Sequence, residues 1–287
     1  MKKYLKKILK FLAENLNTAE TSRQARKHNE LLINDYLERY LYGHEKYTDP
    51  KKLNRYERQA YSQNGEDGII EEIFKRVGTT NKFFVEFGVG NGLENNTAYL
   101  LTKDWQGCWI EGSVDYVNNI KNTFNFLIAE KKLTIANTII TAENIESIFQ
   151  ELKVPVEFDL LSIDIDGNDY WVWEAIKQYR PRVVVAEYNA FFGSEQKWVM
   201  KYNPNHRWQN DSYFGASLKS LELLGARKGY KLVGCNFVGV NAFFVREDLL
   251  HDYFLEPFTS ANHYEPKRNF LVGRRGDKRS FGKFTSI

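Results

Sequence analysis

The stretch of sequence that decides the fold is VEFGVGNG, at residues 85–92. Residues 82–87 form the short apolar run of a buried strand, and glycines follow at positions 88, 90 and 92. Glycine permits a tight turn and lets a ligand approach the backbone closely. Because ligands of open α/β sheets bind at the carboxyl ends of the strands, we predict a strand that ends in a ligand-binding loop.

Downstream of this loop, strand-like and helical patterns alternate. The further predicted strands are residues 107–111, 133–140, 158–163 and 182–186. The predicted helices are residues 97–103, 114–130, 142–152, 170–179 and 216–228. Such alternation implies a parallel sheet with helices on both faces.

The end of the pattern breaks this alternation. Residues 230–236 and 240–245 are strand-like, and only a short connection around Gly239 separates them. A parallel crossover needs a dozen or more residues, so this pair must be antiparallel. The sequence therefore predicts an α/β, Rossmann-like fold with a mostly parallel seven-stranded sheet and an antiparallel last hairpin. This arrangement resembles that of class I methyltransferases.

Two acids near the glycines indicate what the loop binds. A dinucleotide loop has the spacing G-x-G-x-x-G, which residues 88–92 lack. Glu86, just ahead of the glycines, would repel a pyrophosphate but suits a ligand with a cationic amino-acid end. Glu111, about twenty residues after the loop, can accept hydrogen bonds from both ribose hydroxyls. We predict nucleoside binding, the alternatives being an ordinary glycine turn and a solvated acid.

The composition excludes several classes of protein. The 287 residues are 43% hydrophobic and carry a formal net charge of +3, which is typical of a globular protein and does not favour nucleic acid as a partner. Cys108 and Cys235 lie singly in apolar runs, so we expect neither a disulfide framework nor a zinc site. Without a membrane-spanning segment or a secretory signal, the protein is expected to be cytoplasmic.

Four segments within residues 60–246 carry a resemblance to a known family. They are VEFGVGNGLENNT, WIEGS, DLLSIDIDGNDYWVW and GASLKSLELLGARKGYKLVGCNFVGVNAFFV. They resemble the FkbM-like methyltransferases that use S-adenosylmethionine (SAM), and most closely the bacterial branch found with capsule and lipopolysaccharide biosynthesis. The resemblance implies O-methylation of a sugar or a nucleotide-activated sugar. After the fourth predicted strand the family often has an acid and a histidine, where this chain has Asp166-Gly167-Asn168-Asp169.

The resemblance also indicates the cofactor residues. Glu86, Gly88, Gly90 and Glu111 match the family's cofactor motifs. The polar loop at residues 61–68 is expected to fold over the methionine carboxylate of SAM through its amides, unless Asn64 or Glu66 only caps the following helix. With neighbouring positions included, the expected cofactor-binding residues are Gln63, Glu86, Gly88, Gly90, Asn95, Glu111, Gly112, Ser113 and Asp164.

Acidic side chains follow the fourth and fifth predicted strands, at the edge where the methyl group would lie. Methylation of a hydroxyl needs a general base or a divalent cation that acidifies the hydroxyl. Asp164, Glu187 and Asn189 offer oxygen ligands that suit Mg²⁺ or Mn²⁺. The alternative is that Asp164 orients the cofactor amine while the others are structural.

A long loop at residues 191–212 follows the fifth predicted strand and carries His206, the candidate general base. We therefore expect Asp164, Glu187 and His206 to be catalytic, although His206 can also be an ordinary surface histidine. Trp198, Tyr202, Trp208 and Tyr213 could form an aromatic wall for a sugar. Two other functions compete: a nucleic-acid or protein methyltransferase that docks through a basic tail, and a non-catalytic SAM-fold scaffold.

We divide the chain into a helical extension at residues 1–60, a methyltransferase domain at 61–250 and a basic tail at 251–287. The extension has an apolar stripe at helical spacing that a solitary helix would expose, formed by Leu5, Ile8, Leu9, Leu12 and Leu16. We expect it to make a homo-oligomer, with peripheral membrane contact as the alternative. The expected substrate is a small-molecule sugar or nucleotide-sugar, and no nucleic-acid partner is expected.

Overall fold

The computed structural model describes residues 2–271 and 279–283. Its contacts divide the chain into two compact units, Met1–Thr48 and Asp49–Ile287. The seven-stranded sheet and the glycine loop belong to the second unit.

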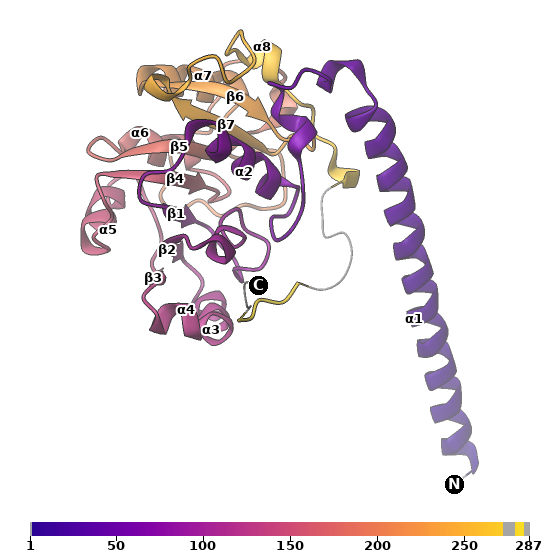
Figure 1. Ribbon diagram of the computed structural model, residues 1–287. Helices are drawn as coiled ribbons and strands as arrows, with labels where there is room; N and C mark the ends of the chain where they lie inside the picture. The colour runs from indigo at the N-terminus through magenta and orange to yellow at the C-terminus, as the bar shows by residue number, and fades with distance from the viewer. Residues whose placement is uncertain (1, 272–278, 284–287) are drawn as a thin grey trace. The chain divides into compact units, whose positions relative to one another are not determined.

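The first unit is one long helix followed by two short turns. Helix α1 spans Lys2–Leu37, the π-turn η1 spans Glu38–Tyr42 and the 3₁₀ turn η2 spans Glu45–Tyr47 (Figure 1). The first glycine of the chain is Gly43, and the first proline comes later still. Neither residue type therefore interrupts the helical hydrogen bonds before that point, and the predicted apolar stripe lies on one continuous helix.

The second unit is built on a seven-stranded sheet of order β3-β2-β1-β4-β5-β7-β6 (Figure 1). The strands are β1 Phe83–Phe87, β2 Gln106–Glu111, β3 Leu133–Asn137, β4 Glu157–Ile163, β5 Arg180–Glu187, β6 Tyr230–Cys235 and β7 Asn241–Arg246. The first five strands are parallel, whereas β7 is antiparallel to both β5 and β6. The predicted Rossmann-like class I methyltransferase fold is confirmed.

The helices of this unit are α2 Glu66–Val77, α3 Val114–Thr123, α4 Asn125–Ala129, α5 Ile145–Glu151, α6 Asp169–Ala175, α7 Leu218–Arg227 and α8 Ser260–His263. Among them, α5, α6 and α7 match predicted helices and are shorter than predicted. Short 3₁₀ turns are η3 Leu53–Tyr56, η4 Leu100–Lys103, η5 Ala190–Phe192, η6 Glu247–Leu249 and η7 Asn269–Leu271. The helix predicted after β1 is wrong: only η4 forms there. The one predicted after β2 is interrupted at Phe124, which separates α3 from α4.

The sheet has an apolar cluster on each face because its side chains alternate. On β1, Val85 and Phe87 join a cluster with Phe149 of α5 and Leu221 of α7. Phe84 joins the opposite cluster, which includes residues of α2 and α3. The carboxyl ends of the strands are left as the free edge for a site.

Both cysteines lie in this core, and they are not joined by a disulfide. Burial raises the pKa of Cys108 to about 12, so this thiol has a structural role and no reactive thiolate at neutral pH. Among residues 2–271 and 279–283, no helix has the length and apolarity that crossing a bilayer requires.

Candidate functional site

The glycine loop lies where the order of the strands reverses, between β1 and β4. Gly88 has a φ of 65°, and a Cβ there would lie 1.7 Å from the Asp164 carbonyl oxygen. Any other residue would push β1 and β4 apart at their carboxyl ends. The close approach therefore brings the glycine loop directly beside the first acid after β4.

Glu111 ties together the loops after β1 and β2. Its Oε2 accepts a hydrogen bond from the Gly90 backbone N–H at 2.9 Å, and its Oε1 accepts one from the Ser113 N–H at 2.8 Å. Each carboxylate oxygen has a further lone pair, so the group can still accept bonds from a ligand. The Ser113 hydroxyl in turn caps α3 by accepting from the Tyr116 N–H.

A cavity of about 450 Å³ opens beside Glu111 at the carboxyl edge of the sheet. Such a volume is within the range of small-molecule sites. Its walls combine the apolar side chains Ile110, Ile139 and Ile165 with acids at Glu111 and Asp164. The predicted cofactor residues in its lining are Gly88, Gly90, Glu111, Gly112, Ser113 and Asp164.

A second cavity of about 260 Å³ lies on the other side of the glycine loop. Gly88, Gly90, Tyr116 and Asp164 line both cavities. The remaining predicted cofactor residues, Gln63, Glu86 and Asn95, line the smaller one. One elongated ligand could therefore span both cavities across the loop.

Glu86 is buried, and protein donors surround its carboxylate. It accepts hydrogen bonds from the Asn95 amide, the Asn96 N–H, both the N–H and the hydroxyl of Thr97, and the Ser162 hydroxyl. Burial raises the pKa of Glu86 to about 7, against the effect of these donors. The carboxylate thus shapes the smaller cavity through the loop at residues 95–97 that it holds.

Two acids at the start of α2 hold the polar loop that precedes it. Asp67 Oδ2 accepts from the backbone N–H groups of residues 60, 61 and 62 and from the Ser62 hydroxyl. Glu66 Oε2 accepts from the Asn64 N–H, and its Oε1 accepts from the amides of Asn236 and Asn241. The sequence suggested Glu66 as one of two possible caps of the following helix. Its bonds to Asn236 and Asn241 were not predicted, because these partners lie about 170 residues away along the chain.

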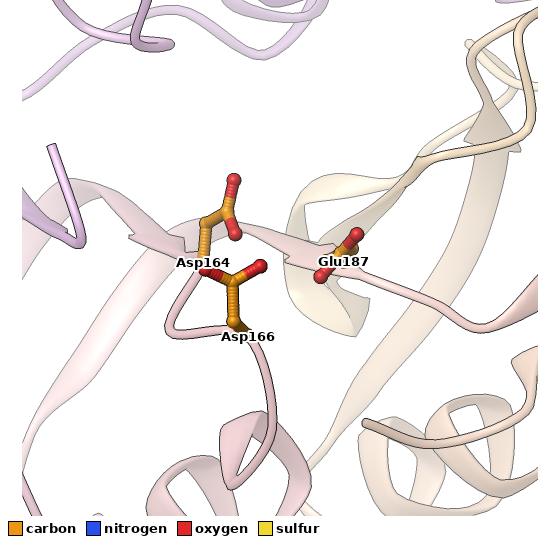
Figure 2. A group of neighbouring side chains, drawn as sticks. All are labelled: Asp164, Asp166 and Glu187. Carbon is orange, nitrogen blue, oxygen red and sulfur yellow. The ribbon is translucent and has the colours of Figure 1, made fainter. Parts of the chain in front are cut away.

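Three carboxylates meet at the ends of β4 and β5. Figure 2 shows Asp164 and Asp166 on the loop after β4 and Glu187 at the end of β5. One oxygen of each lies within 4.8 Å of the others. Burial first, and then the neighbouring acids, raise the pKa of Asp164 and of Glu187 well above the usual range. Such a cluster needs a cation or shared protons to offset its like charges.

Asn189, which we predicted as a metal ligand, has both polar atoms of its side chain hydrogen-bonded within the loop after β5. Its amide donates to the carbonyls of Ser212 and Phe214 at 2.9 and 3.0 Å, and its oxygen accepts from the Phe191 N–H. The side chain is therefore committed to closing the base of the loop after β5. Asp166 lies in the cluster instead, on a turn whose φ is 54° at that residue.

His206 lies beside the cluster, because the loop after β5 folds back onto the turn after β4. It lines the larger cavity together with Asp166, and its Nε2 is buried. A Cβ at Gly167 would lie 2.4 Å from the His206 ring, so only glycine lets the imidazole come so close. Asn168 fastens the loop through hydrogen bonds with the backbone of Asn203.

Two of the four aromatic residues predicted to form a wall, Trp198 and Tyr213, contact each other. Trp198 stacks on Phe192, with ring centroids 4.3 Å apart, and meets Tyr213 edge-on at 5.8 Å. Trp208 donates to the Asp211 carbonyl. Tyr202 points elsewhere, since its hydroxyl bonds Glu143 beyond β3. The candidate wall is therefore Phe192, Trp198 and Tyr213.

Lys267 is a site residue that sequence analysis did not identify. Its ammonium lies 5.4 Å from the Phe191 ring centroid and 5.0 Å from that of Phe214. Burial raises the pKa of Asp166, and the charges of His206 and Lys267 oppose that rise. We predicted residues 251–287 to be a basic tail. Lys267 lies in this range, and its charge acts on Asp166 of the acidic cluster.

The comparisons with known proteins find distant structures only. No family model matches the chain, and no curated protein sequence does. One similar structure is a protein from Klebsiella pneumoniae proposed to be an O-methyltransferase, with a TM-score of 0.44, 13% identity, and coverage of 77% of this chain and 99% of that one.

Two further structures are similar at about the same level. A SAM-dependent methyltransferase from Clostridium acetobutylicum has a TM-score of 0.39 and 11% identity, covering 62% of this chain and 89% of its own. The N-terminal domain of EvdMO1 with S-adenosylhomocysteine (SAH) bound has a TM-score of 0.42 and 10% identity, covering 63% and 79%.

Proposed function

We propose that this chain transfers a methyl group from SAM to a hydroxyl of a sugar or a nucleotide-activated sugar during the synthesis of bacterial capsule or lipopolysaccharide. The observation that carries the proposal is the position of Asp164. It lines both cavities and also belongs to the acidic cluster. A cofactor that spans the cavities would therefore hold its sulfonium beside the carboxylates that can assist the reaction.

The chemistry of the two cavities supports SAM as that cofactor. In the larger one, Glu111 can accept bonds from the ribose hydroxyls while Ile110 and Ile139 offer an apolar surface to adenine. The smaller one is mostly polar, and the amides of Gln63 and Asn95 suit the carboxylate of methionine. The negative charge of Asp164 between them suits the sulfonium and the ammonium group.

The proposed reaction is a single displacement. The acceptor oxygen attacks the methyl carbon, an O–C bond forms while the C–S bond breaks, and the electron pair of that bond stays on sulfur, which leaves SAH. The hydroxyl proton must go to a base. His206 is one candidate, because it lines the cofactor cavity beside Asp166, and a carboxylate of the cluster is the other.

The acidic cluster has the properties of a divalent-cation site. It brings three oxygen ligands together, and Glu187 Oε2 is buried without a hydrogen-bond partner. We propose Asp164, Asp166 and Glu187 as ligands of Mg²⁺ or Mn²⁺. When bound there, such a cation would supply Lewis acidity that lowers the pKa of the acceptor hydroxyl.

The loop after β5 supports a sugar as the acceptor. Phe192, Trp198 and Tyr213 form an aromatic group on the loop that also carries His206. Aromatic faces pack well against the C–H faces of sugars while the hydroxyls remain free to react. The resemblance to the FkbM-like family points to the same acceptor class.

The test is SAM turnover against a panel of nucleotide-activated sugars, with SAH formation as the readout. We expect SAH with at least one sugar, loss of activity in EDTA, and recovery with Mg²⁺ or Mn²⁺. Asp164→Asn should abolish turnover and serves as the negative control. Intact SAH binding without turnover of any sugar would contradict the acceptor class, and activity that resists EDTA would contradict the metal.

A further inference from the structure

We propose that the first three turns of α1, residues 2–12, bind the surface of an anionic lipid bilayer. This proposal is independent of the methyltransferase function, because it concerns the unit that carries no part of the candidate site. It rests on how the sequence is distributed around a helix that the structure shows to be continuous.

The apolar and basic side chains of this segment occupy opposite sides of the helix. A helix turns by about 100° per residue, so its apolar residues fall within an arc of about 160°. The apolar residues are Tyr4, Leu5, Ile8, Leu9, Phe11 and Leu12, whose relative exposure ranges from 48% to 78%. Lys6, Lys7 and Lys10 fall within an arc of about 100° on the opposite side. They too are exposed.

This distribution matches a helix that lies in a membrane interface. Such a helix buries its apolar face among the acyl chains while its lysines stay at the level of the headgroups. The sequence has five lysines among its first ten residues, and the first acidic residue is Glu14. The segment is therefore purely cationic, and its charge complements anionic lipid.

A second copy of the helix fits this surface less well. A parallel pair, or one confined to these turns, would bring the lysines of both copies together without any acid between them. A pair along the whole helix would need an apolar residue every three to four positions. Residues 17–30 read NTAETSRQARKHNE, in which alanine is the only aliphatic residue. The structure shows that this polar stretch continues the same helix, so it would interrupt any such seam.

The experiment is flotation of the full-length protein with two kinds of vesicle. One is phosphatidylcholine alone, and the other is equal parts phosphatidylcholine and phosphatidylglycerol. We expect flotation with the anionic vesicles only, and weaker flotation as salt is added, since salt screens the lysines. Equal flotation with both vesicles would overturn the choice of anionic lipid.

A matched pair of charge-reversal variants locates the surface. The triple variant Lys6→Glu, Lys7→Glu, Lys10→Glu should lose at least tenfold in vesicle affinity. The control Arg23→Glu, Arg26→Glu, Lys27→Glu makes the same change in charge on exposed residues of the same helix and should float like the wild type. Equal loss in both variants would overturn the assignment to residues 2–12.

The same study also tests the alternative, that a second copy of the chain covers the apolar face. If a second copy covers the apolar face, the wild type will not float, and the double variant Leu5→Asp, Leu9→Asp will lower the mass measured by light scattering. That result would overturn the proposal. Circular dichroism checks that each variant is folded, and calorimetry measures its SAH binding. A chain that floats but binds no SAH would refute the proposed function and leave this inference standing.

Discussion

At the scale of single residues, Glu111 is the group through which the loops after β1 and β2 and a bound nucleoside would meet. We expect Glu111→Ala to weaken SAH binding by about tenfold or more, the usual effect of losing hydrogen bonds to a charged group. Isothermal titration calorimetry measures this directly. Asp115→Ala is the matched control, since it removes the same charge from an exposed position on α3 and should bind normally. A chain that binds NAD in preference to SAH would refute the assignment.

We predict that Asp164 and Glu187 act in the transition state more than in cofactor binding. In the proposed reaction both would lie beside the transferred methyl group, and each role open to them there would affect the barrier. We expect Asp164→Asn and Glu187→Gln each to lower kcat by about 100-fold or more, with a smaller change in the Kd for SAH. Glu195→Gln, an exposed acid on the loop after β5, is the control.

The same kinetics distinguish a cation from a histidine base. With His206 as the base, activity should withstand EDTA, fall in His206→Asn, and lose the acidic limb of its pH profile in that variant. Near wild-type rates for both carboxylate variants would show that neither acid takes part in the chemistry.

At the scale of elements, the C-terminal segment holds the polar loop before α2. Arg279 donates to the carbonyls of Ala60 and Ser62 and forms an ion pair of 3.2 Å with Glu94. Phe281 is buried beside it. The segment thus joins the two sides of the smaller cavity, which Gln63 and Glu94 both line.

We expect Arg279→Ala to weaken SAH binding by about tenfold, because the loop would lose charged hydrogen bonds that fix its conformation. Lys283→Ala removes a charge from an exposed position of the same segment and should leave the affinity unchanged. Calorimetry on both variants gives the comparison. Equal affinities would show that the loop keeps its conformation without the segment.

At the scale of the whole molecule, buried acids make stability depend on pH. Burial raises the pKa of Asp67 from 3.8 to about 6 and that of Glu86 from 4.5 to about 7. Between the unfolded and folded pKa values the native state binds more protons than the unfolded state. The contribution of these two groups to the free energy of unfolding is therefore fully present below about pH 4. It is lost as the pH rises through about 6 to 7.

Asp67→Asn removes one of these titrations and keeps an oxygen that can accept from the backbone of residues 60–62. Between pH 4 and pH 8, we expect the free energy of unfolding of the wild type to fall by about 2 kcal/mol more than that of this variant. Urea denaturation at a series of pH values measures the slope. The exposed Asp115→Asn is the control, and an unchanged slope in Asp67→Asn would contradict the raised pKa.

The sequence alone was sufficient to predict the features that depend on short segments of the chain. The alternation of strands and helices, the antiparallel end of the sheet and the glycine loop all follow from local periodicity and from the geometry of glycine. Glu111 could be found because it ends the next parallel strand after that loop, about twenty residues along the chain. The prediction of a helix after β1 was wrong, because Glu86 accepts hydrogen bonds from the backbone N–H groups of Asn96 and Thr97 and holds that segment as a loop. A short helical pattern in the sequence does not reveal these bonds.

Only the tertiary structure decided which side chains meet at the site. A left-handed turn brings Asp166 into the acidic cluster, and two backbone carbonyls accept from the Asn189 amide. The spacing of residues in the sequence reveals neither. Lys267 and Arg279 reach the site from the far end of the chain. The physical reason is that contacts between distant segments depend on how whole elements pack, whereas periodicity records only which face of each element is buried.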